Sequence, residues 1–212
     1  VGLRSFGVDE SQIFCGRKGL TYDIIERITD VRRNGEEATL FVLGESGSGK
    51  SSLVKAGLIP YFKSLNNSEC TYAEHIICPS EFRGNIYEGL LDKLLVLFPG
   101  MENNPVWKEL RQGIDGNFNY EYLSYAIRQC NTLDKPILFL DQFEELFSDN
   151  LIAEADRLQA LRLLYGLSLS KQVMMIISMR NDFYSKFTSY TDFGAIKNES
   201  IVVDIPNVSS SD

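Results

Sequence analysis

The sequence predicts a three-layer α/β fold, in which helices cover both faces of a mostly parallel five-stranded sheet. Apolar runs alternate along the chain with segments of helical periodicity, a pattern typical of layered α/β proteins. Two of the runs, at 137–140 and 173–177, are continuously apolar, as strands are when both of their faces are buried. A glycine-rich loop also separates the first strand from the helix after it. These three observations together favour parallel strands connected by helices.

The elements follow from this alternation. We expect strands at 38–43, 72–78, 136–140, 173–179 and 201–205. Apolar residues recur every three or four positions in the intervening segments, which predicts one-faced helices at 20–33, 50–65, 85–97, 120–130 and 152–169. The stretch 99–118 is rich in Gly, Asn and Pro, which indicates an irregular insertion with one short helix around Trp107.

The length of 212 residues suits one full-sized domain. We expect an N-terminal segment and helix at 1–35 and a core at 36–208, because no repeat or linker separates them. The chain opens at Val1 and closes on a serine-rich tail without a final element. We therefore expect a fragment of a longer protein.

Composition excludes several classes of protein. The 44% hydrophobic and 24% charged content is ordinary for a soluble domain, and no apolar run approaches the roughly 20 residues that span a bilayer. Without a signal peptide either, we expect a cytoplasmic domain with no membrane partner. The formal net charge of -8 disfavours direct nucleic-acid binding, although a local basic patch remains open.

Cysteine and histidine chemistry is also limited. Cys15, Cys70, Cys78 and Cys130 have no CxxC spacing, so we expect reduced thiols. His75 is the only histidine and lies in a strand-like stretch, where a structural role is favoured over a metal or catalytic one.

The segment that carries chemistry runs from Gly44 to Ser51 and matches the pattern G-x-x-x-x-G-K-[ST]. A strand leads into it and a helix leads out. In this setting glycines let backbone N–H groups converge on phosphate oxygens, and the N-terminus of the helix favours the same anion. Lys50 is expected to contact the β- and γ-phosphates, and the Ser51 hydroxyl a magnesium ion. The predicted phosphate-binding residues are Gly44, Glu45, Ser46, Gly47, Ser48, Gly49, Lys50, Ser51 and Ser52.

The G-x-x-x-x-G-K-[ST] pattern at 44–51 is typical of P-loop NTPases, so we expect the fold of that class with the strand order 5-1-4-3-2. Such a site needs an acidic partner on another strand, and Asp141 ends the apolar run 137–140. We expect Asp141 to bind the magnesium ion, through a water. Glu144, or as second choice Glu145, is expected to orient the water that attacks the γ-phosphate. An acidic helix start is an equally good reading of either glutamate alone.

Arg180 follows the strand predicted at 173–179 and should lie at the same edge of the sheet. A guanidinium there could sense the γ-phosphate and stabilise the charge that develops on it. A surface salt bridge is the alternative for a strand-end arginine.

Taken together, these residues resemble the STAND class of P-loop ATPases, specifically the family called novel STAND NTPase 1. The resemblance rests on 2–6, 13–17, 49–60, 141–147 and 179–183. Its most specific part is Asp-Gln-Phe-Glu-Glu-Leu-Phe at 141–147. The resemblance implies that Phe14, Gly16 and Arg17 lie near the base and sugar, and that Arg180 reports on the γ-phosphate. Lys18 stands where the family usually has Glu, which puts the role of that position in doubt.

The resemblance also implies a function. In this class, exchange of ADP for ATP controls a change from a closed monomer to an open oligomer, which attached sensor and effector domains convert into signalling, often in antiviral defence. We therefore expect a slowly hydrolysing ATPase switch that uses Mg²⁺ and associates with itself in the full-length protein.

Two other functions remain open. One is an AAA+-like motor or loader ATPase that acts on DNA, and the other is a scaffold that binds nucleotide without hydrolysing it. A GTPase is disfavoured because no Asn-Lys-x-Asp motif follows a suitable strand. A small-molecule kinase is disfavoured because Asp141 lies far along the chain with two glutamates behind it.

Overall fold

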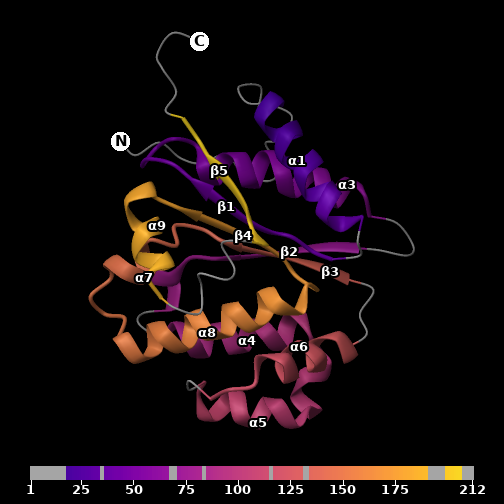
Figure 1. Cartoon of the computed structure of the whole chain (residues 1–212), viewed down its shortest axis with the longest axis vertical. Coiled ribbons are helices and arrows are strands. Elements are labelled where there is room, and N and C mark those ends of the chain that lie inside the picture. The colour runs from indigo at the N-terminus through magenta and orange to yellow at the C-terminus, as the bar shows by residue number, and fades with distance from the viewer. Residues whose placement is uncertain are drawn as a thin grey trace.

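A five-stranded parallel sheet forms the centre of the computed structural model (Figure 1). The structure describes residues 18–33, 36–66, 71–82, 85–114, 117–130, 134–190 and 199–206. The strands are β1 (Thr39–Leu43), β2 (Thr71–Ile77), β3 (Asp134–Leu140), β4 (Met174–Met179) and β5 (Ile201–Asp204). Their order is β2-β3-β4-β1-β5, and all four pairings are parallel. The predicted fold class and strand order are therefore confirmed, with strand ends shifted by one or two residues.

Helices connect the strands. They are α1 (Lys18–Arg32), α2 (Lys50–Ser52), α3 (Ile59–Ser64), α4 (Ile86–Leu97), α5 (Pro105–Gln112), α6 (Tyr120–Gln129), α7 (Glu145–Ser148), α8 (Glu154–Ser170) and α9 (Asn181–Thr188). The short helix expected around Trp107 is α5, and it follows a 3₁₀ turn at Pro99–Asn103. The short helices α7 and α9 were not predicted.

The helix expected at 50–65 is a continuous helical segment at 50–64, which we call the rod, and its hydrogen-bonding pattern changes along its length. A π-helical segment, Leu53–Leu58, separates α2 from α3. Periodicity could not reveal this, because the apolar stripe through Leu53, Val54, Leu58 and Ile59 is buried just as a regular helix would bury it. π-Helical turns are rare and occur frequently at functional sites.

The sheet divides the apolar side chains into two cores. Alternate residues of β1 show this: Leu40 and Val42 belong to the core under α1, the π-helical segment and α3, whereas Phe41 and Leu43 belong to the core under α4, α6 and α8. Figure 1 shows these two helical layers on opposite faces of the sheet. Because both faces are covered, the strands are apolar at nearly every position, which is why they could be recognised in the sequence.

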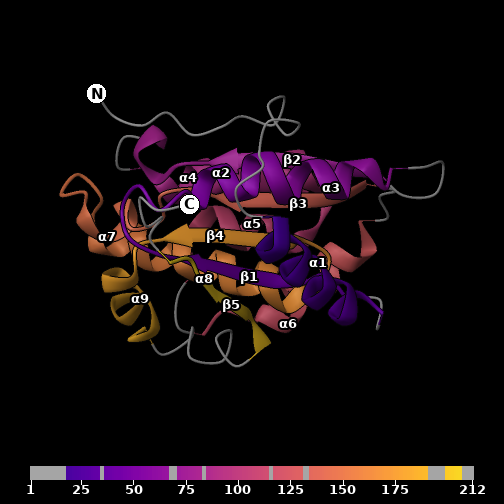
Figure 2. The same ribbon diagram turned by 90° about the horizontal axis from the view of Figure 1, so that it is seen from above.

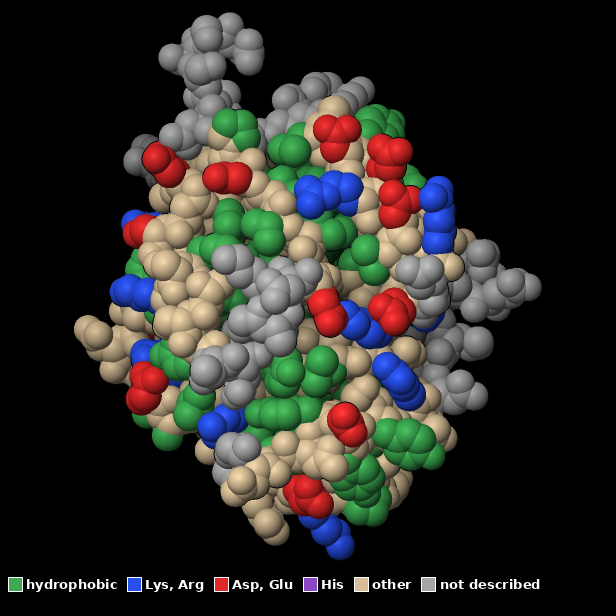
Figure 3. Space-filling view, viewed as in Figure 1, with side chains coloured by type: hydrophobic (Ala, Val, Ile, Leu, Met, Phe, Trp, Pro, Cys, Tyr) green, Lys and Arg blue, Asp and Glu red, His purple; other side chains and the backbone are tan. Residues whose placement is uncertain are grey.

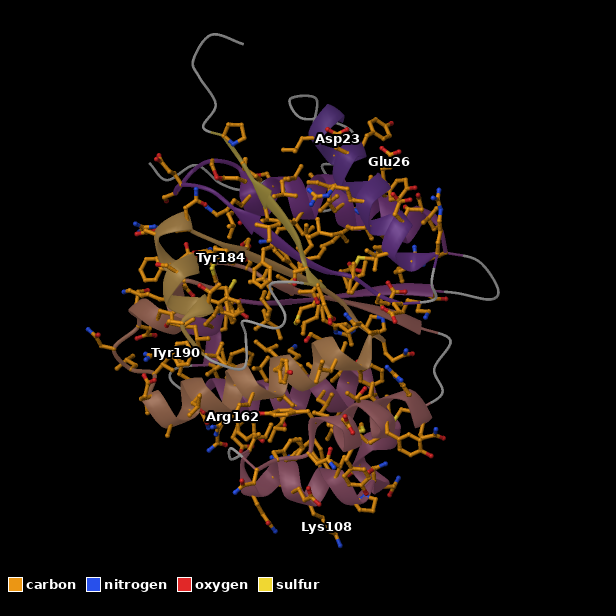
Figure 4. The ribbon with its side chains drawn as sticks, in the orientation of Figure 1. Asp23, Glu26, Lys108, Arg162, Tyr184 and Tyr190 are labelled. Atoms are coloured by element: carbon orange, nitrogen blue, oxygen red, sulfur yellow. The ribbon has the colours of Figure 1, made fainter. Side chains whose placement is uncertain are left out.

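The loop at 44–51, Asp141 and Arg180 follow the carboxyl ends of β1, β3 and β4. In both ribbon views α7 and α9 lie at this same end of the sheet (Figures 1 and 2). Tyr184 of α9 packs on Phe41 of β1 with ring centroids 5.5 Å apart, and the Tyr190 hydroxyl donates to Glu154 at 3.0 Å (Figure 4). The first contact packs α9 against β1, and the second joins the segment just after α9 to the start of α8. Among the helices described, none is long and apolar enough to cross a membrane.

Candidate functional site

The glycine-rich loop leaves β1 and turns sharply before α2. Gly47 and Gly49 have φ angles of 79° and 84°, in the left-handed region that glycine adopts without strain. Gly44 is needed for space, because a Cβ there would meet Ser48 Oγ at 2.6 Å and the Ile205 carbonyl oxygen at 2.9 Å. The tip of the loop at 45–47 is exposed, while Ser48 and Ser52 are buried. The three glycines of the motif are thus there for two reasons, backbone conformation at 47 and 49 and space at 44.

Lys50 begins α2 and folds back over the loop. Its ammonium donates to the carbonyl oxygens of Gly44 at 2.9 Å and Glu45 at 2.7 Å. The residue is 8% exposed. Burial lowers the pKa of this amine, and the nearby carboxylates of Glu144 and Asp141 oppose that shift. The positive charge therefore lies at the mouth of the loop with acidic groups around it.

Asp141 directly follows β3, and its carboxylate meets the start of the rod. Its Oδ1 accepts hydrogen bonds from the Ser51 hydroxyl at 2.6 Å, the Ser178 hydroxyl at 2.8 Å and the Gln142 backbone N–H at 3.1 Å. The residue is only 1% exposed. The backbone turns abruptly after it, since Gln142 has a φ of 53°, which is uncommon outside glycine. Two residues 90 positions apart in the sequence, Ser51 and Asp141, are thus in contact.

Glu144 and Glu145 point to different surroundings. The Glu145 carboxylate accepts from the Ser80 backbone N–H at 3.1 Å, beside the turn after β2. The Oε2 atom of Glu144 is buried and takes part in no hydrogen bond within the described residues. Burial raises the pKa of this carboxyl, against the opposing effect of its own and the Arg180 backbone N–H groups and of the Lys50 charge. Of the two glutamates, Glu144 is the one whose charge acts on Lys50.

Arg180 lies at the end of β4, as the N-cap of α9. Its guanidinium makes two contacts with the Asp182 carboxylate, at 3.1 Å from Nε and 2.7 Å from Nη2, and lies over the Phe183 ring. Its charge also acts on Lys50 and Glu144, so it lies near the loop. Phe14, Gly16 and Arg17, expected near the base and sugar, fall outside the described residues.

The oxygen atoms present fit a magnesium ion that completes its shell with phosphate and water. The Ser51 hydroxyl gives its hydrogen to Asp141, which leaves its lone pairs for a cation, and Mg²⁺ prefers such oxygen ligands. Within the described part of the chain, no group of three or more His, Cys, Asp or Glu side chains could hold a metal by itself. An ion here would therefore depend on a bound phosphate for much of its coordination.

Three contact residues were not found from the sequence. Ser178 is a polar residue inside the apolar run of β4, which was a usable signal. Lys55 lies four residues after Ser51 and pairs with Asp141 Oδ2 at 2.8 Å, and helical spacing could have indicated it. Asp182 lies two residues after Arg180, and its pairing depends on how α9 begins.

Comparison with known proteins agrees with this arrangement. Two solved structures of the Aeropyrum pernix ORC2 protein share the fold at 14% identity, one as ADPNP-ADP complexes (TM-score 0.57, covering 90% of this chain) and one in the ADP form (TM-score 0.55, covering 97%). The chain spans about half the length of these proteins, 48% and 50% of each. No curated protein sequence matches it.

The fold, the phosphate-type loop and the acid at the end of β3 define the chain as an NTPase domain of the P-loop class. A model of the family described as Novel STAND NTPase 1 matches residues 1–211. The chain belongs to that family.

Proposed function

We propose that this chain is the ATP-binding and slowly hydrolysing switch domain of a STAND-type signalling or defence ATPase. The observation that carries the proposal is the 2.6 Å contact between Ser51 and Asp141, with the Lys50 ammonium beside them. It joins the glycine-rich loop to the strand-end acid, and this pairing is what a nucleotide–magnesium complex requires.

Each residue has a defined part in the proposal. Backbone N–H groups of 44–52 would hold the phosphates, and Lys50 would exchange its two loop carbonyl oxygens for phosphate oxygens. Ser51 and Asp141 would hold magnesium, which when bound neutralises phosphate charge. Glu144 would orient the attacking water and Arg180 would contact the γ-phosphate. Phe14, Gly16 and Arg17 would bind the base and sugar, as the family implies.

Binding calorimetry with magnesium-ATP tests the proposal. Because Lys50 supplies the full charge at the loop, we expect Lys50→Ala to weaken binding by about a hundredfold. Lys63→Ala is the matched control, since Lys63 lies on the same rod but pairs with Glu74 at 2.8 Å on β2. Thermal unfolding of both variants separates lost binding from lost folding. Equal affinity of a folded Lys50→Ala variant and the parent would rule out the proposed site.

The switch itself concerns the longer protein, in which we propose that sensor and effector domains adjoin this one. We expect the longer protein to associate when ADP is replaced by ATP, because the γ-phosphate would draw the Arg180 guanidinium away from Asp182. Association would raise its sedimentation coefficient. A coefficient that is the same with both nucleotides would contradict nucleotide-controlled assembly.

A scaffold that binds nucleotide without hydrolysing it is the second candidate. Two contacts favour it, because each pairs a cationic side chain of the proposed site with protein atoms. The Lys50 ammonium donates to loop carbonyl oxygens, and the Arg180 guanidinium pairs with Asp182. Phosphate release by the triggered full-length protein separates the two functions, since the scaffold would release none.

A further inference from the structure

The carboxylate of Asp141 is held from both of its oxygen atoms. While Oδ1 accepts three hydrogen bonds, Oδ2 lies 2.8 Å from the ammonium nitrogen of Lys55. Oδ2 accepts no directed hydrogen bond from the described residues, so the Lys55 charge is what balances it. The Lys55 side chain is 20% exposed and the Asp141 side chain 1%, which makes this a largely buried ion pair.

The rod delivers both contacts from one side. Ser51 and Lys55 are four residues apart and reach the same carboxylate, one at each oxygen. The π-helical segment Leu53–Leu58 begins between them and includes Lys55. The Lys55 ammonium also lies 5.8 Å from the centre of the Phe139 ring on β3, which places the lysine along the strand that carries Asp141.

Removal of Lys55 would leave a buried carboxylate oxygen without a partner. An uncompensated buried charge is strongly unfavourable. A rotation of the carboxylate would relieve it, and such a rotation would move Oδ1 away from the Ser51 hydroxyl. The orientation of Ser51 would then depend on a residue that lies a full helical turn away.

We propose that Lys55 is a positioning residue for the magnesium side of the nucleotide site. By pairing with Oδ2 it holds Oδ1 against Ser51, so that the hydroxyl keeps its hydrogen on Asp141 and directs its lone pairs at the metal position. This inference rests on the proposed function. It adds a residue that touches neither nucleotide nor metal, yet sets how strongly magnesium supports binding.

The test is the magnesium dependence of ATP binding. The dissociation constant of ATP is measured with excess MgCl₂ and again with EDTA. The constant in EDTA divided by the constant in MgCl₂ gives the contribution of the metal to binding. We expect Lys55→Met to lower this ratio about tenfold, the range found when a residue behind a metal ligand is lost. Lys55→Arg keeps the positive charge and should retain most of the ratio.

Lys63→Met is the matched control, because it removes another lysine–carboxylate pair of the same rod with the same 2.8 Å separation. We expect it to keep the ratio of the parent. A purely structural role of Lys55 would lower thermal stability but leave the ratio unchanged. If Lys55→Met does not fold, Lys55→Gln serves the same comparison, because it is neutral and nearly as long.

The outcomes are distinct. A reduced ratio in Lys55→Met alone supports the inference. An unchanged ratio in a folded neutral variant, with a parent that binds ATP more tightly in magnesium, overturns the inference and leaves the proposed function standing. A parent that binds ATP in neither buffer overturns both.

Discussion

The buried carboxyl of Glu144 lowers the free energy of unfolding when it is ionised. Its carboxyl is buried, one of its oxygens takes part in no hydrogen bond within the described residues, and burial raises its pKa. A folded pKa above the unfolded one means that the folded chain binds more protons, between the ordinary value near 4.5 and the raised one. The free energy of unfolding that Glu144 contributes therefore falls as pH rises through this interval.

We predict that Glu144→Gln is more stable than the parent at neutral pH, because the amide carries no charge to bury. In urea unfolding the difference should grow as pH rises above about 4.5 and then level off. The same variant should bind magnesium-ATP but release phosphate at least about a hundredfold more slowly, since it cannot polarise water. A stability difference that is constant with pH, or unchanged phosphate release, would contradict one or the other role.

At the scale of an element, α4 depends on α8 for its N-terminal cap. The residue at the N-cap of α4, Asn85, makes no side-chain capping bond. Instead the carboxylate of Asp156 on α8 accepts hydrogen bonds from the backbone N–H groups of Ile86 at 2.8 Å and Tyr87 at 3.2 Å. A negative charge at this end also interacts favourably with the helix dipole. One carboxylate thus caps one helix and joins it to another.

We predict that Asp156→Ala lowers the free energy of unfolding by about 2 kcal/mol, the upper range for loss of a cap. Asp156→Asn should cost less, because its amide oxygen can still accept one bond. Asp92→Ala is the control, since Asp92 is an exposed acid on α4 whose pairing partner Arg111 is 3.8 Å away. Chemical denaturation of the three variants is the measurement. Equal loss in Asp92→Ala and Asp156→Ala would contradict a capping role.

At the scale of the whole molecule, the charge distribution bears on partners. The net charge is -8, and acidic and basic side chains are interspersed on the face shown in Figure 3. Asp23 and Glu26 extend outward from α1, while Lys108 lies at the opposite end of the molecule on α5 (Figure 4). A DNA backbone requires clustered cations, which this arrangement does not offer on the face shown.

We predict that this domain does not bind duplex DNA at physiological salt. Fluorescence anisotropy with a labelled 30-base-pair duplex, with and without ATP, should show no binding at micromolar protein. Binding that weakens steeply with added salt would instead favour the DNA-linked motor or loader, because such dependence reports contacts to phosphates.

The sequence alone determined the layers of the fold and the identity of the loop. Strands buried on both faces are apolar throughout, helices carry stripes, and 44–51 holds its chemistry in consecutive residues, so all three are local signals. Strand order followed from the class of fold that this loop indicated. Boundaries moved by a residue or two. The four-residue helix α7 was missed because it is too short for a period to show, and α9 was missed although α5 of the same length was predicted.

Only the tertiary structure decided which side chains meet. Whether the charge of Glu144 or of Glu145 acts on Lys50 depends on how the chain turns after Asp141, where Gln142 takes a left-handed conformation. The sequence placed Ser51 and Asp141 at one magnesium site, but their direct hydrogen bond across 90 positions was seen only in the structure. The same is true of the ion pair between Asp141 and Lys55, which lies in a π-helical segment. Hydrophobic periodicity records which face of an element is buried, but it contains no information on which polar groups that burial brings within hydrogen-bonding distance.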